Sequence, residues 1–331
     1  MISMKTLVTG GAGYIGGTVV RQLQQAGHDV TVYDNLGHGK RENVPAGVPL
    51  IVGDVADSAK LNELFSQNKF DAVLHFAALI EAGESVQKPD LYFANNTAAT
   101  LTLLNAMAAH KIPRFVFSST AAVYGNPDAT PIQETAKLAP VNPYGESKLR
   151  VEQELPKFRE LYGLRYAVLR YFNVAGALLV NGKAGYGEQH EPESHLIPLL
   201  LDVALGLRQN IKIYGADYPT PDGTCIRDYI HVADVGHAHL LALEALTQHE
   251  TLLYNLGNGR GFSVREVVEA VRRVTGHAIP AITEPRRPGD PAILVADATR
   301  IAAELGWKPE TAKLDDIIAS AWTWHQHRFG K

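Results

Sequence analysis

The fold is decided by the run Thr9-Gly10-Gly11-Ala12-Gly13-Tyr14-Ile15-Gly16, which follows the predicted strand 6–8 and opens the predicted helix 13–26. Its glycines at positions 10, 13 and 16 have the spacing G-x-x-G-x-x-G. Glycines in such a pattern allow a tight turn, let the backbone approach a pyrophosphate, and let helix and strand pack closely. The phosphates then lie over the helix N-terminus. The spacing therefore predicts a dinucleotide site, although a glycine pattern alone also fits an ordinary turn between strand and helix.

Beyond this run, the first half of the chain alternates short β-branched runs with helical patterns. The predicted strands are 6–8, 30–33, 49–52, 72–75, 115–117 and 166–169, and helices near 58–68, 91–110 and 144–162 separate the later ones. Alternation of this kind predicts an α/β fold with a doubly wound parallel sheet, Rossmann-like, that carries helices on both faces.

The alternation ends after residue 175, where glycine, proline and charged residues become denser. Helical patterns follow at 194–206, 233–247, 263–275 and 313–328, with strand-like runs near 211–214, 226–230, 253–256 and 279–283. We therefore predict a dinucleotide-binding domain over 1–175, completed by segments near 225–255. Residues 176–331 are predicted to form a smaller mixed α/β lobe that binds the substrate.

The composition indicates a globular chain in a reducing compartment. The chain has 331 residues, of which 46% are hydrophobic, and a formal net charge of −4. Its charges form no long block of one sign, so we expect neither nucleic-acid binding nor attraction to a membrane. Cys225 is the only cysteine, which excludes a disulfide within the chain. Residues 1–5 lack the apolar region of a signal peptide, and we expect a cytoplasmic protein.

The 13 histidines invite a search for metal ligands. His190 and His195 lie five residues apart in a predicted loop, and His325 and His327 fall on opposite sides of the last predicted helix. Neither pair has the arrangement of a zinc site. We therefore predict that these histidines form no ligand cluster and that the protein binds no metal.

An acidic residue follows the glycines at the distance that a dinucleotide site requires. Asp34 ends the second predicted strand, about 20 residues beyond the glycines. A carboxylate at this position accepts hydrogen bonds from the ribose hydroxyls and repels a 2′-phosphate, which favours NAD over NADP. Asp54 and Val55 end the third predicted strand and are expected near the adenine.

A tyrosine and a lysine share one face of the predicted helix 144–162. Tyr144 and Lys148 have the spacing i, i+4, and Thr120 ends the fifth predicted strand in the run Ser118-Ser119-Thr120. A phenol with an ordinary pKa near ~10 is a weak base at neutral pH. A nearby lysine and a cationic nicotinamide would both lower that pKa, and Thr120 can hydrogen-bond the same substrate hydroxyl. These three residues are the predicted catalytic group.

The motifs along the chain resemble the extended short-chain dehydrogenase/reductase superfamily and, within it, the UDP-glucose 4-epimerase family. The most specific are R-D-Y-I-H-V, from Arg227 to Val232, and Y-N-L-G, from Tyr254 to Gly257. The other matching segments are 8–16, 34–36, 75–78, 83–86, 144–148, 169–173, 223–226 and 286–290. Together they span nearly the whole chain.

The resemblance implies a reaction and the residues that perform it. Tyr144 would take the proton of the sugar 4-hydroxyl, Thr120 would assist, and Lys148 would hold the nicotinamide ribose. Hydride would pass from sugar C4 to a tightly held NAD. The 4-keto sugar would turn about its link to the diphosphate and receive the hydride on its other face. UDP-glucose and UDP-galactose would thus interconvert without net redox change.

The resemblance also implies the residues that bind each ligand. Those for NAD are Gly10, Gly13, Tyr14, Ile15, Gly16, Asp34, Asn35, Asp54, Val55, Phe76, Ala77, Ala78, Asn95, Ser118, Tyr144, Lys148 and Tyr171. Those for the UDP-sugar are Thr120, Tyr144, Asn173, His195, Leu196, Tyr214, Arg227, Arg287 and Asp290. The arginines would pair with phosphate oxygens. A homodimer through the helices near 91–110 and 144–162 is implied as well.

Departures from the family pattern leave alternatives open. Ile80 stands where many members carry a lysine, which leaves the strength of NAD retention open. Leu294 stands where members size the sugar pocket, so an epimerase of UDP-N-acetylglucosamine is one alternative. Thr120 is followed by Ala121 and Ala122 rather than the acid pair of nucleotide-sugar 4,6-dehydratases, which disfavours dehydration. A 4-reductase and a non-catalytic dinucleotide sensor are the remaining alternatives.

Overall fold

The structure is a computed structural model that describes residues 3–287 and 290–330. Pro288 and Gly289, which belong to the matching segment 286–290, lie outside the described residues. The chain divides into two compact units. The first contains residues 1–125, 137–170 and 236–254, and the second contains residues 126–136, 171–235 and 255–331.

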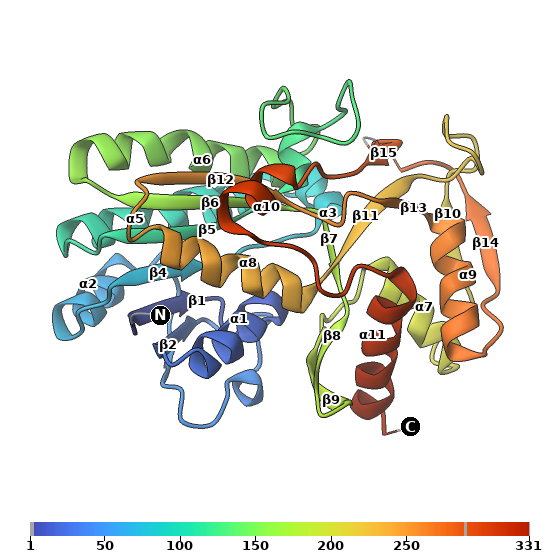
Figure 1. Ribbon diagram of the computed structural model, residues 1–331, viewed down its shortest axis with the longest axis horizontal. Helices are drawn as coiled ribbons and strands as arrows, with labels where there is room; N and C mark the ends of the chain where they lie inside the picture. The colour runs from blue at the N-terminus through green and yellow to red at the C-terminus, as the bar shows by residue number, and fades with distance from the viewer. Residues whose placement is uncertain (1–2, 288–289, 331) are drawn as a thin grey trace. The chain divides into compact units, whose positions relative to one another are not determined.

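A seven-stranded sheet forms the centre of the first unit, in the order β12-β6-β5-β4-β1-β2-β3 (Figure 1). Its strands are β1 (Lys5–Thr9), β2 (Asp29–Asp34), β3 (Leu50–Val52), β4 (Ala72–His75), β5 (Arg114–Thr120), β6 (Arg165–Tyr171) and β12 (Thr251–Leu256). β1 pairs in parallel with both β2 and β4. The strand order therefore reverses at β1, and in such a sheet ligands bind beyond the carboxyl ends of the strands at the reversal. The predicted doubly wound sheet is confirmed.

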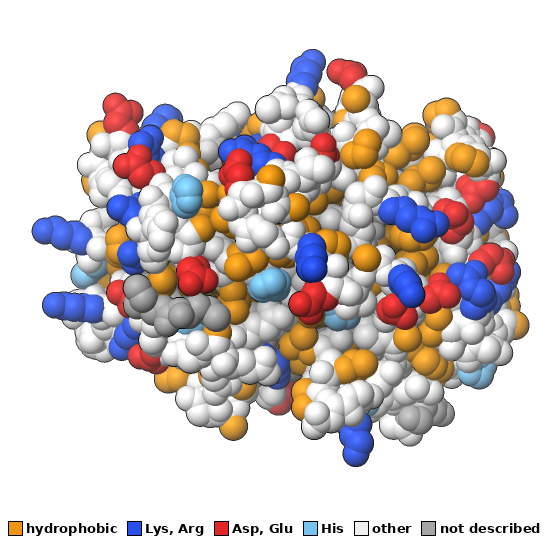
Figure 2. All heavy atoms as spheres, in the orientation of Figure 1, with side chains coloured by type: hydrophobic (Ala, Val, Ile, Leu, Met, Phe, Trp, Pro, Cys, Tyr) orange, Lys and Arg blue, Asp and Glu red, His pale blue; other side chains and the backbone are white. Residues whose placement is uncertain are grey.

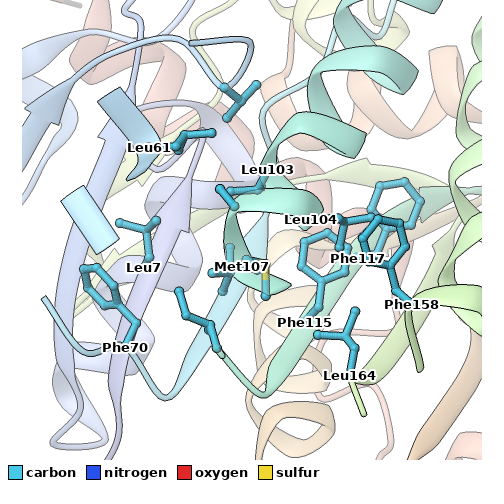
Figure 3. Packing of buried hydrophobic residues seen from close by; sticks show 14 of the residues in the cluster. Leu7, Leu61, Phe70, Leu103, Leu104, Met107, Phe115, Phe117, Phe158 and Leu164 are labelled. Atoms are coloured by element: carbon cyan, nitrogen blue, oxygen red, sulfur yellow. The ribbon is translucent and has the colours of Figure 1, made fainter. Parts of the chain in front are cut away.

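Helices cover both faces of this sheet. They are α1 (Tyr14–Gln25), α2 (Ser58–Gln67), α3 (Ala82–Gln87), α4 (Pro89–Tyr92), α5 (Ala99–Ala109), α6 (Pro143–Tyr162) and α8 (Val232–Ala245), with short turns η1 (Arg41–Asn43) and η3 (Ala121–Tyr124). α2, α5 and α6 lie on one face, and α1 and α8 lie on the other (Figure 1). On the first face, Leu104 and Met107 of α5 and Phe158 of α6 pack against Phe115 and Phe117 of β5 (Figure 3). This packing sets the position of α6 above β5.

The helix predicted near 91–110 is interrupted by a π-helical turn, η2 (Phe93–Ala98), between α4 and α5. The buried Asn96 lies inside this turn and reaches two other segments. Its side chain pairs with both backbone groups of Leu79, at 2.9 Å each, and its amide nitrogen lies 3.1 Å from Ser147 Oγ. The 3.6-residue period of the sequence predicts a helix here, but it does not predict the wider π-helical turn. The partners of Asn96, Leu79 and Ser147, are remote in sequence, and no local pattern indicates them.

The second unit is a mixture of helices and small sheets. Its strands are β7 (Asn173–Ala175), β8 (Ala177–Val180), β9 (Lys183–Gly187), β10 (Ile211–Tyr214), β11 (Ile226–His231), β13 (Gly261–Ser263), β14 (Ala281–Glu284) and β15 (Ile293–Leu294). Its helices are α7 (Leu196–Ala204), α9 (Val264–Thr275), α10 (Thr299–Leu305) and α11 (Leu314–Arg328). β11 pairs with β13, β15 and β7, and β10 pairs with β14. The expected mixed α/β character is confirmed.

The hairpin of β8 and β9 was not predicted from the sequence. Its tip is Asn181-Gly182, and both residues have positive φ, at 52° and 73°. Asn-Gly is a preferred pair for a two-residue hairpin turn, so this dipeptide could have indicated the hairpin from the sequence. The hairpin fixes where β9 ends, and the chain passes from that point directly into the segment that precedes α7.

Lysines and arginines are mixed with acidic residues on the face drawn in Figure 2, with apolar side chains between them. A mixed surface of this kind provides no basic stripe for a nucleic acid on that face. Among the described residues, no helix combines the length and the apolar character needed to cross a membrane.

Candidate functional site

The glycine-rich loop lies at the carboxyl end of β1, and two of its glycines are required by the chain itself. Gly10 has a φ of +73°, and a Cβ there would lie 2.5 Å from the backbone nitrogen of Ala77. A Cβ on Gly16 would lie 2.3 Å from the carbonyl oxygen of Gly10. At both positions the backbone of another residue lies too close for a side chain. This close approach explains glycine at positions 10 and 16 without any ligand.

Gly13 is different, because no neighbouring atom excludes a side chain there. A Cβ would meet only the oxygen of Gly10, at an ordinary 3.4 Å, and φ is −88°. Gly13 is the N-cap of α1, and it makes no side-chain cap. A Cβ would therefore fill the space above the helix N-terminus, where an anion binds. The glycine leaves this space open, and the loop fits the pyrophosphate of a dinucleotide.

The two glycines predict opposite results when each is replaced by alanine. Gly13→Ala should keep the stability of the chain and weaken NAD binding by about tenfold or more, ~1.4 kcal/mol. Gly16→Ala should lower the free energy of unfolding by about 1–3 kcal/mol, because the loop must shift to admit the methyl group. Denaturant unfolding and NAD titration of both variants measure the contrast. Equal destabilisation by the two substitutions would contradict these separate roles.

Asp34 lies at the end of β2 and ties that strand to the glycine-rich loop. Its side chain is 7% exposed and accepts from the backbone N–H of Ala12 at 3.0 Å and of Leu36 at 2.8 Å. Each carboxylate oxygen keeps a second lone pair for a ribose hydroxyl. Asn35 donates to Asp54 at 2.8 Å, which joins the ends of β2 and β3. The predicted residues Asp34, Asn35 and Asp54 are thus brought together.

Other residues predicted to bind the cofactor line up at the ends of β4 and β5. The nitrogen of Phe76 donates to the oxygen of Thr9, and its ring centroid lies 4.8 Å from that of His239. Ala77 and Ala78 follow at once, with Ala77 against the glycine-rich loop. Ser118 lies 3.1 Å from the buried His239, a neighbour that no local pattern in the sequence indicates.

The remaining residues predicted to bind the cofactor lie in the hydrophobic core, in helical turns or in the second unit. Val55 is buried in the hydrophobic core, and Tyr14 is buried in the first turn of α1, next to the half-buried Ile15. Asn95 lies in the π-helical turn and donates to Asn96 at 2.9 Å. Tyr171, by contrast, is the first residue of a segment of the second unit.

The predicted catalytic residues come together where α6 begins beside the end of β5. Asn142 caps α6 by accepting from the nitrogen of Gly145 at 2.9 Å, and this sets Tyr144 in the first turn. Thr120 interacts with the phenol of Tyr144 in the sense that lowers its pKa. The buried Lys148 donates to the carbonyl oxygen of Ser118 at 2.9 Å. The spacing in the sequence predicts all three on one site, and the structure brings them together there.

Burial, a hydrogen bond and charges act on the pKa values of Tyr144 and Lys148. Burial raises the pKa of Tyr144, the hydrogen bond with Thr120 lowers it, and the charge of Glu81 raises it. Burial lowers the pKa of Lys148 to about 7, although Glu152 opposes the change. Thr120 is thus a group that lowers the phenol pKa, and the same effect of Lys148 stays a prediction.

A buried ion pair lies beside the predicted catalytic residues, and it was not predicted from the sequence. Glu152 and Arg170 have side chains only 7% and 3% exposed, and their closest N–O distance is 2.5 Å. Ser119 also lies 2.5 Å from Glu152, and Arg170 donates to Tyr124 at 2.9 Å. The pair joins α6 to β5 and β6. The signal was available, because Glu152 follows Lys148 by four residues on the same helical face.

In the second unit, the structure brings several predicted substrate residues into pairs. Arg227 of β11 forms an ion pair with Asp290, and it lies in register with Leu294 of β15. Arg287 lies over the ring of Tyr214, 4.0 Å from its centroid. Asn173 of β7 pairs in register with Tyr229 of β11.

Asp228 is the sequence neighbour of Arg227, but the ion-pair partner of Arg227 is Asp290, and Asp228 has a different role. Asp228 is fully buried and accepts from the backbone nitrogens of Asn258, Gly259 and Ala296, at 2.8, 3.0 and 3.2 Å. Burial raises the pKa of Asp228 to about 6, although these hydrogen bonds oppose the change. The guanidinium of Arg227 is thus directed to Asp290.

The segment before α7 contradicts one prediction. His190 and His195 were expected to form no ligand cluster, but they lie together with Glu188 and Glu193. The reason is the course of the backbone, which turns between β9 and α7 so that these side chains converge. Here His195 is the N-cap of α7, and Leu196 is its first residue. Burial lowers the pKa of His195, but Glu188 and Glu193 raise it well above its ordinary value.

Comparisons with known proteins agree with this geometry. The model of the NAD dependent epimerase/dehydratase family matches residues 6–257. The UDP-glucose 4-epimerase of Streptomyces lividans is 52% identical over 325 residues, which is 98% of this chain and 97% of that protein.

Two solved structures are also close. The UDP-glucose 4-epimerase from Bifidobacterium longum, in complex with NAD+ and UDP, has a TM-score of 0.92 and 40% identity, covering 98% of each chain. The UDP-Glc/GlcNAc 4-epimerase from Campylobacter jejuni has a TM-score of 0.85 and 40% identity, covering 98% of this chain and 100% of that one.

Proposed function

The chain belongs to the NAD dependent epimerase/dehydratase family, and we propose that it is an isomerase that interconverts UDP-galactose and UDP-glucose with tightly bound NAD. The observation that carries the proposal is the pair of Tyr144 and Thr120, in which Thr120 lowers the pKa of the phenol, with Lys148 one helical turn from Tyr144. This pair lies at the carboxyl edge of a sheet whose glycine-rich loop fits a dinucleotide.

In the proposed reaction, the chain moves one proton and holds the reactants in place. Tyr144 removes the proton of the sugar 4-hydroxyl, and Thr120 hydrogen-bonds the same oxygen. NAD, when bound, supplies the hydride acceptor and donor. Lys148 holds the end of β5 through its hydrogen bond to Ser118, and its other N–H groups would hold the nicotinamide ribose. The oxidised sugar turns about its link to the diphosphate, and Tyr144 returns the proton.

The residues beyond Thr120 argue against elimination of water. Ala121 and Ala122 follow it in the turn η3, and neither can protonate a leaving hydroxyl. A dehydratase needs an acid for that step. The retained tyrosine, lysine and threonine favour catalysis over a sensor role, and Asp34 disfavours the NADPH that a 4-reductase would exchange.

An epimerase that also accepts N-acetylated sugars is the second candidate. The half-buried Leu294 stands at the predicted position that sizes the sugar pocket. The Campylobacter jejuni relative is described as acting on both kinds of sugar. A leucine leaves less room than a smaller residue, so this proposal places UDP-galactose first.

The deciding assay incubates the pure protein with UDP-galactose, first without added nucleotide and then with NAD. Formation of UDP-glucose without a matching build-up of NADH is the expected result. A need for added NAD would show that Ile80 weakens retention of the cofactor. No conversion in either condition would overturn the assignment to UDP-galactose, and UDP-N-acetylgalactosamine under the same conditions tests the second candidate.

Thr120→Val should move the pH dependence of the reaction. The base acts as a phenolate, so kcat/KM rises as the pH approaches the pKa of Tyr144 from below. The hydrogen bond with Thr120 lowers that pKa, and its removal should shift the rising limb to higher pH. Thr120→Ser keeps a hydroxyl and should leave the limb in place. An unshifted limb in the valine variant would contradict the role of this hydrogen bond.

Arg287 and Arg286 form a matched pair for testing the diphosphate contact. Each lies over a tyrosine ring, but Arg286 is also ion-paired with Asp217 at 2.6 Å. If Arg287 binds a phosphate oxygen, Arg287→Ala should raise KM for the UDP-sugar about 10- to 100-fold, ~1.5–3 kcal/mol. Arg286→Ala should raise KM much less. Similar effects of both substitutions would mean that Arg287 has no special contact.

A homodimer through the helical segments near 91–110 and 144–162 is part of the proposal. Residues 91–109 contain no charged residue, although Leu91, Ala94, Ala98 and Asn105 are exposed. Uncharged exposed faces are typical of the buried part of an interface. Light scattering should give twice the 36.0 kDa chain mass. Ala98→Glu should reduce this to one chain mass, whereas Ser66→Glu on α2 should not; a monomeric wild type would refute the dimer.

The proposal also places the enzyme in galactose metabolism in the cytoplasm. Its single cysteine, Cys225, is buried, and burial raises the pKa of the thiol. A thiol of this kind is inert and needs no oxidising compartment.

A further inference from the structure

Two imidazoles and two carboxylates converge between β9 and α7. Glu188, His190, Glu193 and His195 each offer one ligand atom, and these four atoms all lie within 4.8 Å of one another. Nδ1 of His190 and Nδ1 of His195 lie 2.9 and 2.8 Å from the same oxygen of Glu188. We propose that these four side chains bind one Zn²⁺ ion, so that the imidazole of His195 is a metal ligand rather than the UDP-sugar contact that the family resemblance implies.

Hydrogen bonds within the cluster do not satisfy all of its polar atoms. Nδ1 of His195 carries one hydrogen at most, yet it lies 2.8 Å from Glu188 and 3.1 Å from Glu193. Among the described residues, the second carboxylate oxygen of Glu193, Oε2, is buried and has no hydrogen-bond partner. A buried carboxylate oxygen without a partner is costly. A single cation between the four side chains would neutralise the negative charge of both carboxylates and give the free oxygen a partner.

The donor set favours zinc over harder cations. Imidazole nitrogen and carboxylate oxygen are ordinary zinc ligands, at about 2.0–2.2 Å from the metal, whereas Ca²⁺ and Mg²⁺ take oxygen ligands. Ligands around a tetrahedral zinc ion of this size lie about 3.4 Å from one another. The three contacts at 2.8, 2.9 and 3.1 Å are close to that spacing. The widest separation must close by about 1.4 Å, which side-chain rotation can supply.

The surroundings indicate a structural rather than a catalytic ion. Four protein ligands fill a tetrahedral shell and leave no open position for water or substrate. α11 already holds the segment from outside the cluster: Trp324 donates to the carbonyl of Glu188 at 2.9 Å, and Arg328 pairs with Glu191 at 3.1 Å. The ion would cross-link residues 188–195 and fix the first turn of α7. Its presence is therefore expected to show in binding and stability, apart from any effect on turnover.

The test uses the full-length protein after chelator treatment and dialysis. Calorimetric titration with Zn²⁺ should give one site per chain, and Zn²⁺ should raise the unfolding temperature. Co²⁺ in the same site should give the strong visible absorption of a four-coordinate ion. Glu188→Gln and His190→Asn should each weaken Zn²⁺ binding at least about tenfold and abolish the Co²⁺ spectrum. His277→Asn removes an exposed histidine elsewhere in the same unit and should change neither result.

Several outcomes would overturn the proposal. Absence of a Zn²⁺ site in the wild type would do so, as would only the weak absorption of six-coordinate Co²⁺. Equal loss of binding in the His277→Asn control would show adventitious binding to surface histidines. Circular dichroism identifies a variant that fails to fold, and the wild-type Co²⁺ spectrum then decides the question. None of these readouts depends on the proposed epimerase activity.

Discussion

Tyr144→Phe is expected to lower kcat for conversion of UDP-galactose about 1,000-fold, within the range of about 10²–10⁴ that a positioned general base contributes. The substitution removes the hydroxyl proposed to take the sugar proton and leaves Thr120, whose hydroxyl is a far weaker base. The ring itself should stay in place, because it packs edge-to-face against Tyr92 with centroids 6.5 Å apart. NAD binding and the unfolding temperature should therefore match the wild type.

The control for this experiment lies on the same helix. Tyr162 is the last residue of α6 and is 58% exposed, so Tyr162→Phe should leave kcat, NAD binding and stability unchanged. Steady-state rates and cofactor titration on both variants make the comparison. Substantial turnover by Tyr144→Phe would remove the phenol from the mechanism and with it the assignment of Thr120 as its partner.

The second large effect concerns the buried pair of Glu152 and Arg170. Glu152→Ala would leave the guanidinium of Arg170 buried beside Tyr124 without its compensating carboxylate, and breaking such a pair costs about 3–5 kcal/mol. Denaturant unfolding should show a loss of that size. Removal of Glu152 also takes away the charge that raises the pKa of Lys148, so that pKa should fall further below about 7.

A double variant separates the broken pair from the loss of packing. Glu152→Leu combined with Arg170→Met removes both charges and keeps side chains of similar size, and such replacements are often close to neutral. The double variant should therefore be more stable than Glu152→Ala alone. If the two are equally unstable, lost packing rather than an uncompensated charge explains the effect.

Local sequence patterns were enough to predict many of the helices and strands. The strands β1 to β6 and the helices α1, α2 and α6 were predicted within a few residues, because burial against a flat sheet imposes periods of 2 and 3.6 residues on the chain. Two neighbours of the proposed sites were missed although a signal existed. The dipeptide Asn181-Gly182 indicates the β8–β9 hairpin, and the spacing of Glu152 from Lys148 indicates that its carboxylate lies beside the predicted catalytic residues.

Spacings of a few residues were enough to predict the doubly wound sheet, the glycine-rich loop and the candidate residues Tyr144, Thr120 and Lys148. What these groups contact depends on the tertiary structure. Lys148 donates to the backbone of Ser118, and four side chains that could hold a metal converge before α7, where the spacing of His190 and His195 had predicted no cluster. Burial and backbone course set these contacts, and neither is a property of local sequence.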